Sequence, residues 1–420
     1  MLVSAIQHPA VPSLSIENLG ALAQRNGLAQ DAFRKRRIEG LRCEIPSKIN
    51  LYLEVLGRRP DGYHDLDTIM HAVDLTDLLE IYPSETSAIE LCIDTSQAQQ
   101  ITGVNEQHTA CDRAFDIPSD ASNLIVRALE SLRKALATSN PQHTPNPQQK
   151  SNPQLPGAKV ILRKRIPAQA GLGGGSADAA AALVLGSLLW TGQVDFRCIR
   201  SLAAQLGSDL NFFLDGQSNL DGQSDHDGQS DLDGQSDHDG SLDRNSLHGW
   251  TARCTGRGEC VVPLDIDLRL HGVIVHPREG CNTQAVFSRL RSDGALEGPR
   301  RTPDPLLEVL AVLSSAPPRT TLVNDWNQLG GLLYNRLDDA AKKTTAWVQR
   351  AAIRLDRYNP HGQCLSGSGS ARFCLCSSRE QADEIAEEIL KEGDYRAYSV
   401  SSWRTPALTQ QVNQVWISTE

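Results

Sequence analysis

Apolar residues alternate with polar ones in several parts of the chain, which is the pattern of β-strands. From position 49 to 55 every second residue is Ile, Leu or Val, so one face of a strand is expected to be buried and the other is not. Lys48 and Asn50 fall together on the opposite face. A Pro-Asp-Gly turn at 60–62 ends this strand. Other segments that fit strands are residues 78–82, 88–93, 160–166, 249–253 and 372–376.

Two segments have the period of a helix instead. Between 124 and 136 the apolar residues share one helical face, and Asp120 or Ser122 can cap the start. Residues 195–206 predict a second helix, with Asp195 as its N-cap and Gly207 at its end.

Three segments have neither period. Residues 1–42 read as an extension, 139–156 are rich in Pro and Gln, and 215–243 repeat a six-residue unit that begins Asp-Gly-Gln-Ser. The repeat lacks the regular apolar position that a β-helix needs, so we expect disordered or surface segments. Calcium binding is a weaker alternative, because the repeat has neither the spacing nor the closing Glu of an EF-hand.

The repeat also carries most of the net charge. The chain has 420 residues and a formal charge of -10. The repeat holds nine Asp and no Lys, Arg or Glu, which leaves the remainder close to neutral. Because the chain has no excess of positive charge, it is not expected to bind nucleic acid over a large surface. A small anionic substrate is still compatible with this charge, since it needs only a local positive site.

Cysteine spacing and hydropathy argue against a zinc-binding protein and a membrane protein. The ten cysteines include no Cys-x-x-Cys pair, so reduced structural thiols are favoured over a zinc site. No apolar run approaches the roughly 20 residues that span a bilayer. The sequence predicts a soluble cytoplasmic protein with no membrane partner.

A glycine-rich loop between a strand and an Ala-rich helix is the most informative segment. Its glycines let backbone N–H groups approach a ligand, and the helix start adds free N–H groups and a positive dipole end. It lacks the Gly-Lys-Ser/Thr of a Walker loop, fits Gly-x-Gly-x-x-Gly poorly, and holds three consecutive glycines that are costly to order in a plain turn. We therefore expect it to bind phosphates. The loop comprises Pro167, Ala168, Gln169, Ala170, Gly171, Leu172, Gly173, Gly174, Gly175, Ser176 and Ala177.

Two other segments carry candidate chemistry. Asp209 follows the helix at 195–206 after Gly207 and Ser208, and it precedes the largely apolar residues 210–214, which we interpret as a strand. Such an Asp can act as a general base, although alone it is more often a capping or turn residue. Residues 365–371 form a second glycine turn, which alone would be a flexible hairpin, but two glycine loops favour a shared site.

Taken together, these segments resemble the GHMP kinases, and the resemblance covers roughly residues 43–400. It implies an α+β fold with a ribosomal protein S5-like N-terminal domain and a ferredoxin-like C-terminal domain. The implied division is an extension at 1–42, an ATP-binding domain at 43–267 with inserts at 139–156 and 215–245, and a second domain at 268–420. The motifs that carry the resemblance are residues 46–51, 57–64, 166–180, 207–209 and 365–371.

The resemblance also implies chemistry. Asp209 matches the family's general base, and Lys48 matches the neighbour that keeps this carboxylate ionised. ATP would be the co-substrate, with Mg²⁺, and the glycine loop would wrap its phosphates. Ser176 is the candidate metal contact by position, whereas Asp178 could equally be an acid favoured at a helix start.

The stretch ending in Tyr63-His64 is similar to that of family members whose substrate is a cytidine diphosphate sugar alcohol of the non-mevalonate isoprenoid route. There the two rings would receive the cytosine, and Phe287 would close its other side. A surface-turn His and a core Phe are the plainer alternatives. The remaining substrate contacts implied by the family are Asn50, Thr283, Gly367 and Gly369.

Three hypotheses for the function follow. The first is phosphorylation of that sugar alcohol. The second is a GHMP kinase of the homoserine or mevalonate type, for which a cytosine clamp has no use. The third is a catalytically silent GHMP-fold binding protein, against which Lys48 and Asp209 argue. The expected partners are small molecules, without nucleic acid, and the expected state is a monomer or homodimer.

Overall fold

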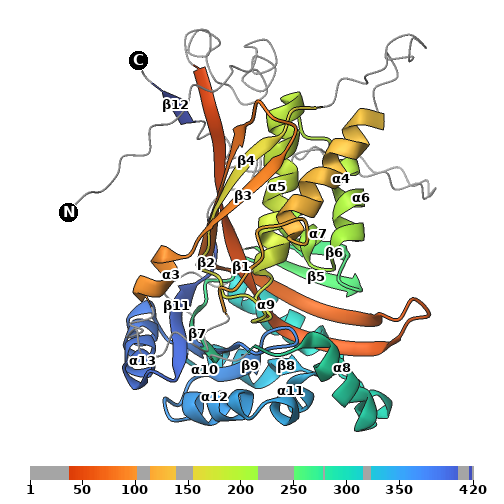
Figure 1. The fold of residues 1–420 in the computed structure, drawn as a ribbon. Coiled ribbons are helices and arrows are strands. Elements are labelled where there is room, and N and C mark those ends of the chain that lie inside the picture. Colours follow the sequence, from red (N-terminus) through yellow and green to blue (C-terminus); the bar gives the residue numbers. More distant parts are fainter. Residues whose placement is uncertain are drawn as a thin grey trace, which may run out of the picture.

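A computed structural model describes most of the chain, as two packed α+β units (Figure 1). The extension up to residue 36, the Pro/Gln-rich segment at 139–154 and the repeats at 216–243 lie outside the described residues. The described ranges are 37–101, 114–138, 155–215, 250–277, 280–315, 323–404 and 416–418.

The first unit is built on an eight-stranded sheet around one long hairpin. Strands β1 (Arg37–Arg58) and β2 (His64–Pro83) pair antiparallel, and their shared tip projects to one side of the molecule in Figure 1. β1 begins six residues before the predicted boundary at Cys43. The central order is β12-β1-β2-β4-β3, with β5 and β6 beside β2 and β8 beside β1. The other strands are β3 (Ile89–Asp94), β4 (Ala158–Arg163), β5 (Thr251–Gly256), β6 (Cys260–Leu264), β8 (Tyr334–Asn335) and β12 (Trp416–Ser418).

Strand β1 is buried on both faces, contrary to the half-exposed strand that its alternation predicts. The apolar residues at 49–55 are buried, and so are Lys48 and Asn50 on the other face. The polar face is covered by other parts of the candidate site, which alternation alone does not reveal. The expectation that residues 249–253 continue the same sheet is confirmed by the pairing of β5 with β2.

Helices cover one face of this sheet (Figure 1). α5 (Gly174–Thr191) is buried along most of its length, because its Ala and Gly residues allow close packing against α4 (Leu124–Thr138) and the sheet. α6 (Phe196–Leu206) has the predicted Asp195 cap and ends at Gly207. A short helix, α3 (Ser96–Ile101), follows β3.

Two sequence expectations in this layer were wrong. Asn123, rather than Asp120 or Ser122, caps α4, since its side-chain oxygen accepts a hydrogen bond from Ile125 N at 2.9 Å. Residues Leu210–Asp215 form helix α7 and not a strand. Apolar residues at 210, 213 and 214 have the i, i+3, i+4 spacing of one helical face, and this short run satisfies both periods.

The second unit is a four-stranded antiparallel sheet in the order β11-β7-β10-β9. Helices α12 (Ala346–Asp356) and α13 (Arg379–Glu392) pack on one face. The other face shares a core with β1 and the glycine loop, so the two sheets are joined by buried apolar side chains. Its strands are β7 (His271–Pro277), β9 (Gly362–Leu365), β10 (Arg372–Cys376) and β11 (Tyr395–Ser401). The remaining elements are α8 (Thr283–Ser292), η3 (Ala295–Glu297), α9 (Asp304–Ser315), α10 (Val323–Leu332) and α11 (Asp338–Thr344).

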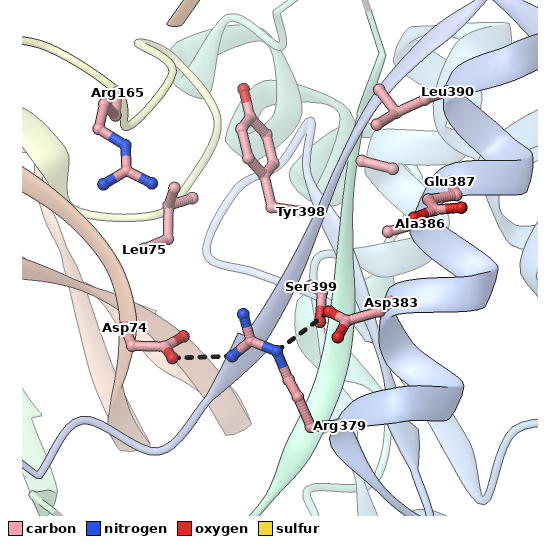
Figure 2. A pocket seen from close by; sticks show the side chains of 11 residues that line it. Asp74, Leu75, Arg165, Arg379, Asp383, Ala386, Glu387, Leu390, Tyr398 and Ser399 are labelled. Carbon is pink, nitrogen blue, oxygen red and sulfur yellow. Dashed lines mark hydrogen bonds and ion pairs between the residues drawn. The ribbon is translucent and has the colours of Figure 1, made fainter. Parts of the chain in front are cut away.

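Polar contacts also cross between the units. A cavity of about 350 Å³ is lined by residues of β2, β11 and α13 and by Arg165, which follows β4. In it, Arg379 binds Asp74 of β2 at 2.9 Å and Asp383 of its own helix at 3.1 Å (Figure 2). None of the predicted site residues lines this cavity.

Within the described ranges, no helix is long and apolar enough to cross a membrane. Over the same part of the chain, no group of three or more His, Cys, Asp and Glu side chains is arranged to hold a metal ion. Cys374 and Cys376 are buried in β10.

Candidate active site

The structure brings Lys48 and Asp209 together from distant parts of the chain. Lys48 lies in the middle of β1, and Asp209 lies in the connection between α6 and α7. Lys48 Nζ is 3.5 Å from Asp209 Oδ2, and the side chains are 3% and 26% exposed. The carboxylate therefore reaches solvent with a buried positive charge behind it.

Asn50 fixes the direction of Lys48. Its Oδ1 accepts a hydrogen bond from Lys48 Nζ at 2.6 Å and another from Gly367 N at 2.8 Å. Its Nδ2 donates to Thr68 Oγ1 at 2.8 Å. Because Asn50 is 0% exposed, we interpret it as a positioning residue, whereas the family resemblance implied a substrate contact.

The two glycine-rich loops meet beside Lys48. Ser366 Oγ donates to Gly171 O at 2.9 Å, and Ala371 N donates to Ala170 O at 3.1 Å. The first loop is also tied to β1, since Lys48 N donates to Leu172 O at 3.0 Å. The predicted phosphate loop and the second glycine turn thus line one site.

The glycines of the phosphate loop have different neighbours. A Cβ on Gly171 would lie 2.0 Å from Ser366 O, and one on Gly174 would lie 2.8 Å from Lys164 Nζ. Gly173 has a φ of 73° and caps α5. A Cβ on Gly175 would meet nothing within 4 Å. The loop is therefore packed on one side and open at Gly175.

This asymmetry predicts opposite effects of two alanine substitutions on stability. Gly171→Ala should lower the free energy of unfolding by about 2–3 kcal/mol, because the new Cβ collides with backbone at a φ of 74°. Gly175 lies in helix α5. Gly175→Ala should therefore leave the free energy of unfolding unchanged or raise it by about 0.5–1 kcal/mol. Urea denaturation of both variants tests this, and equal losses would contradict it.

Three rings gather near the tip of the β1–β2 hairpin. His64 stacks on Phe287 of α8, with ring centroids 4.5 Å apart and planes 21° apart. Tyr63 is 54% exposed, so its ring is available for stacking by a ligand. Thr283, at the start of α8, shares a 2.8 Å hydroxyl hydrogen bond with Ser368. Helix α8 thus contacts His64 through Phe287 and the second glycine turn through Thr283.

His64 has the chemistry to read a polar ligand edge. Burial lowers the pKa of His64, and the positive charges of Arg291 and Arg58 lower it further. The ring is thus neutral near pH 7 and offers one donor and one acceptor. Its Nε2 is buried and has no hydrogen-bond partner among the described residues.

Sequence reasoning missed a buried ionic cluster under the phosphate loop. Lys164 Nζ contacts Asp77 Oδ2 and lies 2.9 Å from Asp178 Oδ2, and all three side chains are buried. Asp77 Oδ1 also accepts hydrogen bonds from Arg165 N at 2.6 Å and Ile166 N at 2.9 Å. The cluster therefore holds the chain where it enters the loop. Asp178 lies at the start of α5 with its Oδ2 bound to Lys164.

Lys164 had a signal in the sequence. It continues the apolar face of Val160 and Leu162, and a Lys on a buried face requires a charged partner. The sequence signal for Asn335 was weaker, because it is only a single amide side chain after an apolar run. Its Nδ2 donates to Leu365 O at 2.9 Å and Gly367 O at 2.8 Å, which holds the second glycine turn.

Comparison with known proteins agrees with this geometry. Residues 123–217 match the GHMP kinases N terminal domain, and residues 319–394 match the GHMP kinases C terminal domain. A protein of Mycolicibacterium vanbaalenii named 4-diphosphocytidyl-2-C-methyl-D-erythritol kinase is 31% identical over 364 residues, covering 85% of this chain and 88% of the relative. One of the same name from Mycobacterium marinum is 29% identical over 362 residues, covering 86% and 89%.

Solved structures give the same result. A crystal structure of 4-(cytidine 5'-diphospho)-2C-methyl-D-erythritol kinase superposes with a TM-score of 0.56 at 25% identity, covering 86% of this chain and 98% of the other. L. major mevalonate kinase superposes with a TM-score of 0.52 at 13% identity, covering 89% and 99%, which shows a common fold alone. The two-domain α+β GHMP fold expected from the sequence is confirmed. Matched over most of its length by these relatives, the chain belongs to the 4-diphosphocytidyl-2-C-methyl-D-erythritol kinase family of GHMP kinases.

Proposed function

We propose that this protein transfers the γ-phosphate of ATP to the 2-hydroxyl of 4-diphosphocytidyl-2-C-methyl-D-erythritol, which gives the 2-phosphate and ADP in the non-mevalonate isoprenoid pathway. The observation that carries the proposal is the Lys48–Asp209 pair, 3.5 Å apart beside two joined glycine loops. The names of the relatives support the same substrate.

The proposed reaction needs a base and a fixed positive charge. A tertiary alcohol is a poor nucleophile, so Asp209 accepts its proton as the new P–O bond forms and the bond to ADP breaks. Lys48 places a positive charge 3.5 Å from Asp209 and is held in place by Asn50. Because phosphoryl transfer depends mainly on positioning and electrostatic stabilisation, this buried and hydrogen-bonded lysine suits the step.

The phosphates of ATP are assigned to the loop at 167–177. Its open side at Gly175 and the N-terminus of α5 offer backbone N–H groups and a positive dipole end. We propose that Mg²⁺ enters with ATP and that Ser176 contacts it. One hydroxyl fits this role, because Mg²⁺ takes most of its ligands from water and phosphate oxygens. When bound, the ion would neutralise phosphate charge.

The aromatic cluster favours this substrate over those of other GHMP kinases. Tyr63 offers a ring that is 54% exposed, which is suited to stacking by a heteroaromatic base. Homoserine and mevalonate contain no ring for these groups to recognise.

Three further points belong to the same proposal. The domain boundary is placed near residue 267, the protein acts in the cytoplasm as a monomer or homodimer, and its partners are small molecules without nucleic acid. The net charge of -10 supports the last of these.

The test is ADP release by the purified full chain with ATP, Mg²⁺ and each of three acceptors. Turnover is expected with 4-diphosphocytidyl-2-C-methyl-D-erythritol, and none with homoserine or mevalonate. A folded protein that releases no ADP with the first acceptor, or that prefers another, would contradict the proposal.

A further inference from the structure

The turn between β5 and β6 lies next to the exposed aromatic ring of the site. Gly256 at the end of β5 pairs with Leu66 of β2, so the next residue, Arg257, emerges beside the 63–65 end of that strand. The Arg257 guanidinium carbon is 5.0 Å from the centroid of the Tyr63 ring, a cation–π distance. The register of the sheet thus places a positive charge on the candidate base-binding ring.

Arg257 is held in this position by its other contacts. Its Nη2 donates to Ala204 O in α6 at 2.6 Å, and its Nε is 3.5 Å from Glu259 Oε1. The side chain is 22% exposed. The guanidinium is therefore fixed and partly removed from solvent, which strengthens its interaction with a bound anion.

The same turn packs against the residue that precedes Asp209. A Cβ on Gly258 would lie 3.1 Å from Ser208 O, and Ala204 belongs to the helix that leads to Asp209. Arg257 is thus anchored between Tyr63 and the catalytic end of the site. A ligand with its base on Tyr63 and its hydroxyl at Asp209 has its linking group near this guanidinium.

The charge of Arg257 is less compensated than that of its neighbour Arg59. Arg59 binds two carboxylates, Asp61 at 3.2 Å and Asp65 at 2.9 Å. Arg257 has one carboxylate within ion-pair distance, Glu259 at 3.5 Å, its charge also lowers the pKa of Asp61, and its Nη1 makes no hydrogen bond within the described residues. An arginine with a spare donor suits phosphate oxygens in particular.

We infer that Arg257 forms a subsite for the diphosphate of a nucleoside diphosphate substrate, and so selects substrates that carry this group between base and reacting alcohol. The inference rests on the proposed function, because it takes the base to lie on Tyr63 and the alcohol at Asp209. It adds a specificity-determining residue from a turn outside the motifs that identify the family.

Binding of cytidine and of cytidine 5'-diphosphate, measured by calorimetry with the ATP site saturated by a non-hydrolysable analogue, tests this directly. Arg257→Gln should weaken the diphosphate about 10- to 100-fold, the range for a lost charged hydrogen bond. It should change cytidine affinity less than about twofold, because a neutral ligand lacks the charge that arginine binds. Arg257→Lys should recover part of the loss.

Arg350→Gln is the matched control. It removes a guanidinium 5.1 Å from the Trp347 ring, in the second unit, and should leave both affinities unchanged. Equal weakening of both ligands by Arg257→Gln would show that Arg257 only supports the Tyr63 ring, and unchanged affinities would show no contact. Either result overturns the inference.

Two further results separate the inference from other failures. If the wild type binds neither ligand and releases no ADP, the proposed function itself fails. If Arg257→Gln does not fold, the salt dependence of wild-type binding decides the matter. The diphosphate affinity should then fall with added salt more steeply than the cytidine affinity, and parallel slopes would overturn the inference.

Discussion

Asp209→Asn is expected to lower kcat about 100- to 10,000-fold, the usual contribution of a positioned general base. The amide keeps the size of the side chain but cannot accept the proton of the substrate alcohol. Lys48 would remain 3% exposed and bonded to Asn50, so the site should keep its shape. Steady-state ADP release at saturating ATP measures the effect.

The control is Asp195, which lies at the other end of the helix that precedes Asp209. Asp195 caps α6 by accepting hydrogen bonds from Arg197 N and Cys198 N, and Asn is an equally good capping residue. Asp195→Asn should therefore leave kcat unchanged. A kcat for Asp209→Asn within about threefold of wild type would exclude Asp209 as the base, provided that the variant still binds the substrate.

Much of this site could be predicted from the sequence because its parts are local. A glycine loop before an Ala-rich helix already predicts a phosphate site, and Lys48 and Asn50 are neighbours on one strand face by period alone. The fold was predicted from the resemblance of the sequence motifs to those of the GHMP kinases. The structure adds that the two glycine loops are joined by the hydrogen bond from Ser366 to Gly171.

What could not be predicted depends on packing between distant segments. Arg257 reaches Tyr63 only because Gly256 pairs with Leu66, a register that the sequence does not specify. The contact of His64 with Phe287 joins residues more than 200 positions apart. α7 was taken for a strand because six residues are too few to separate the two periods.

The buried cluster beneath the loop shows how stability and function are coupled here. Asp77 receives two backbone N–H groups from the loop entry and contacts Lys164, which in turn contacts Asp178 at the start of α5. The charges of Asp178 and Asp77 raise the pKa of Lys164 against the opposing effect of burial. One lysine thus ties together the strand that enters the phosphate loop and the helix that leaves it.

Lys164→Met should consequently destabilise the protein by about 3–5 kcal/mol, because it leaves two buried carboxylates without their cation. Urea denaturation measures the loss. Lys343→Met is the matched control, since Lys343 also pairs with an aspartate, Asp293 at 2.8 Å, but is 58% exposed. An exposed pair of this kind contributes about 0–1 kcal/mol to stability. Lys164→Met should therefore lower the free energy of unfolding several times more than Lys343→Met.

A second substitution separates the loss of charge pairing from the loss of packing. In the double variant Lys164→Met with Asp178→Asn, one of the two uncompensated charges is gone, so part of the stability should return. The KM for ATP should rise in Lys164→Met and fall back in the double variant, because Asp77 would again hold the loop entry. If the double variant is no more stable than Lys164→Met, the cluster acts through packing, and its electrostatic role in positioning the phosphate loop is refuted.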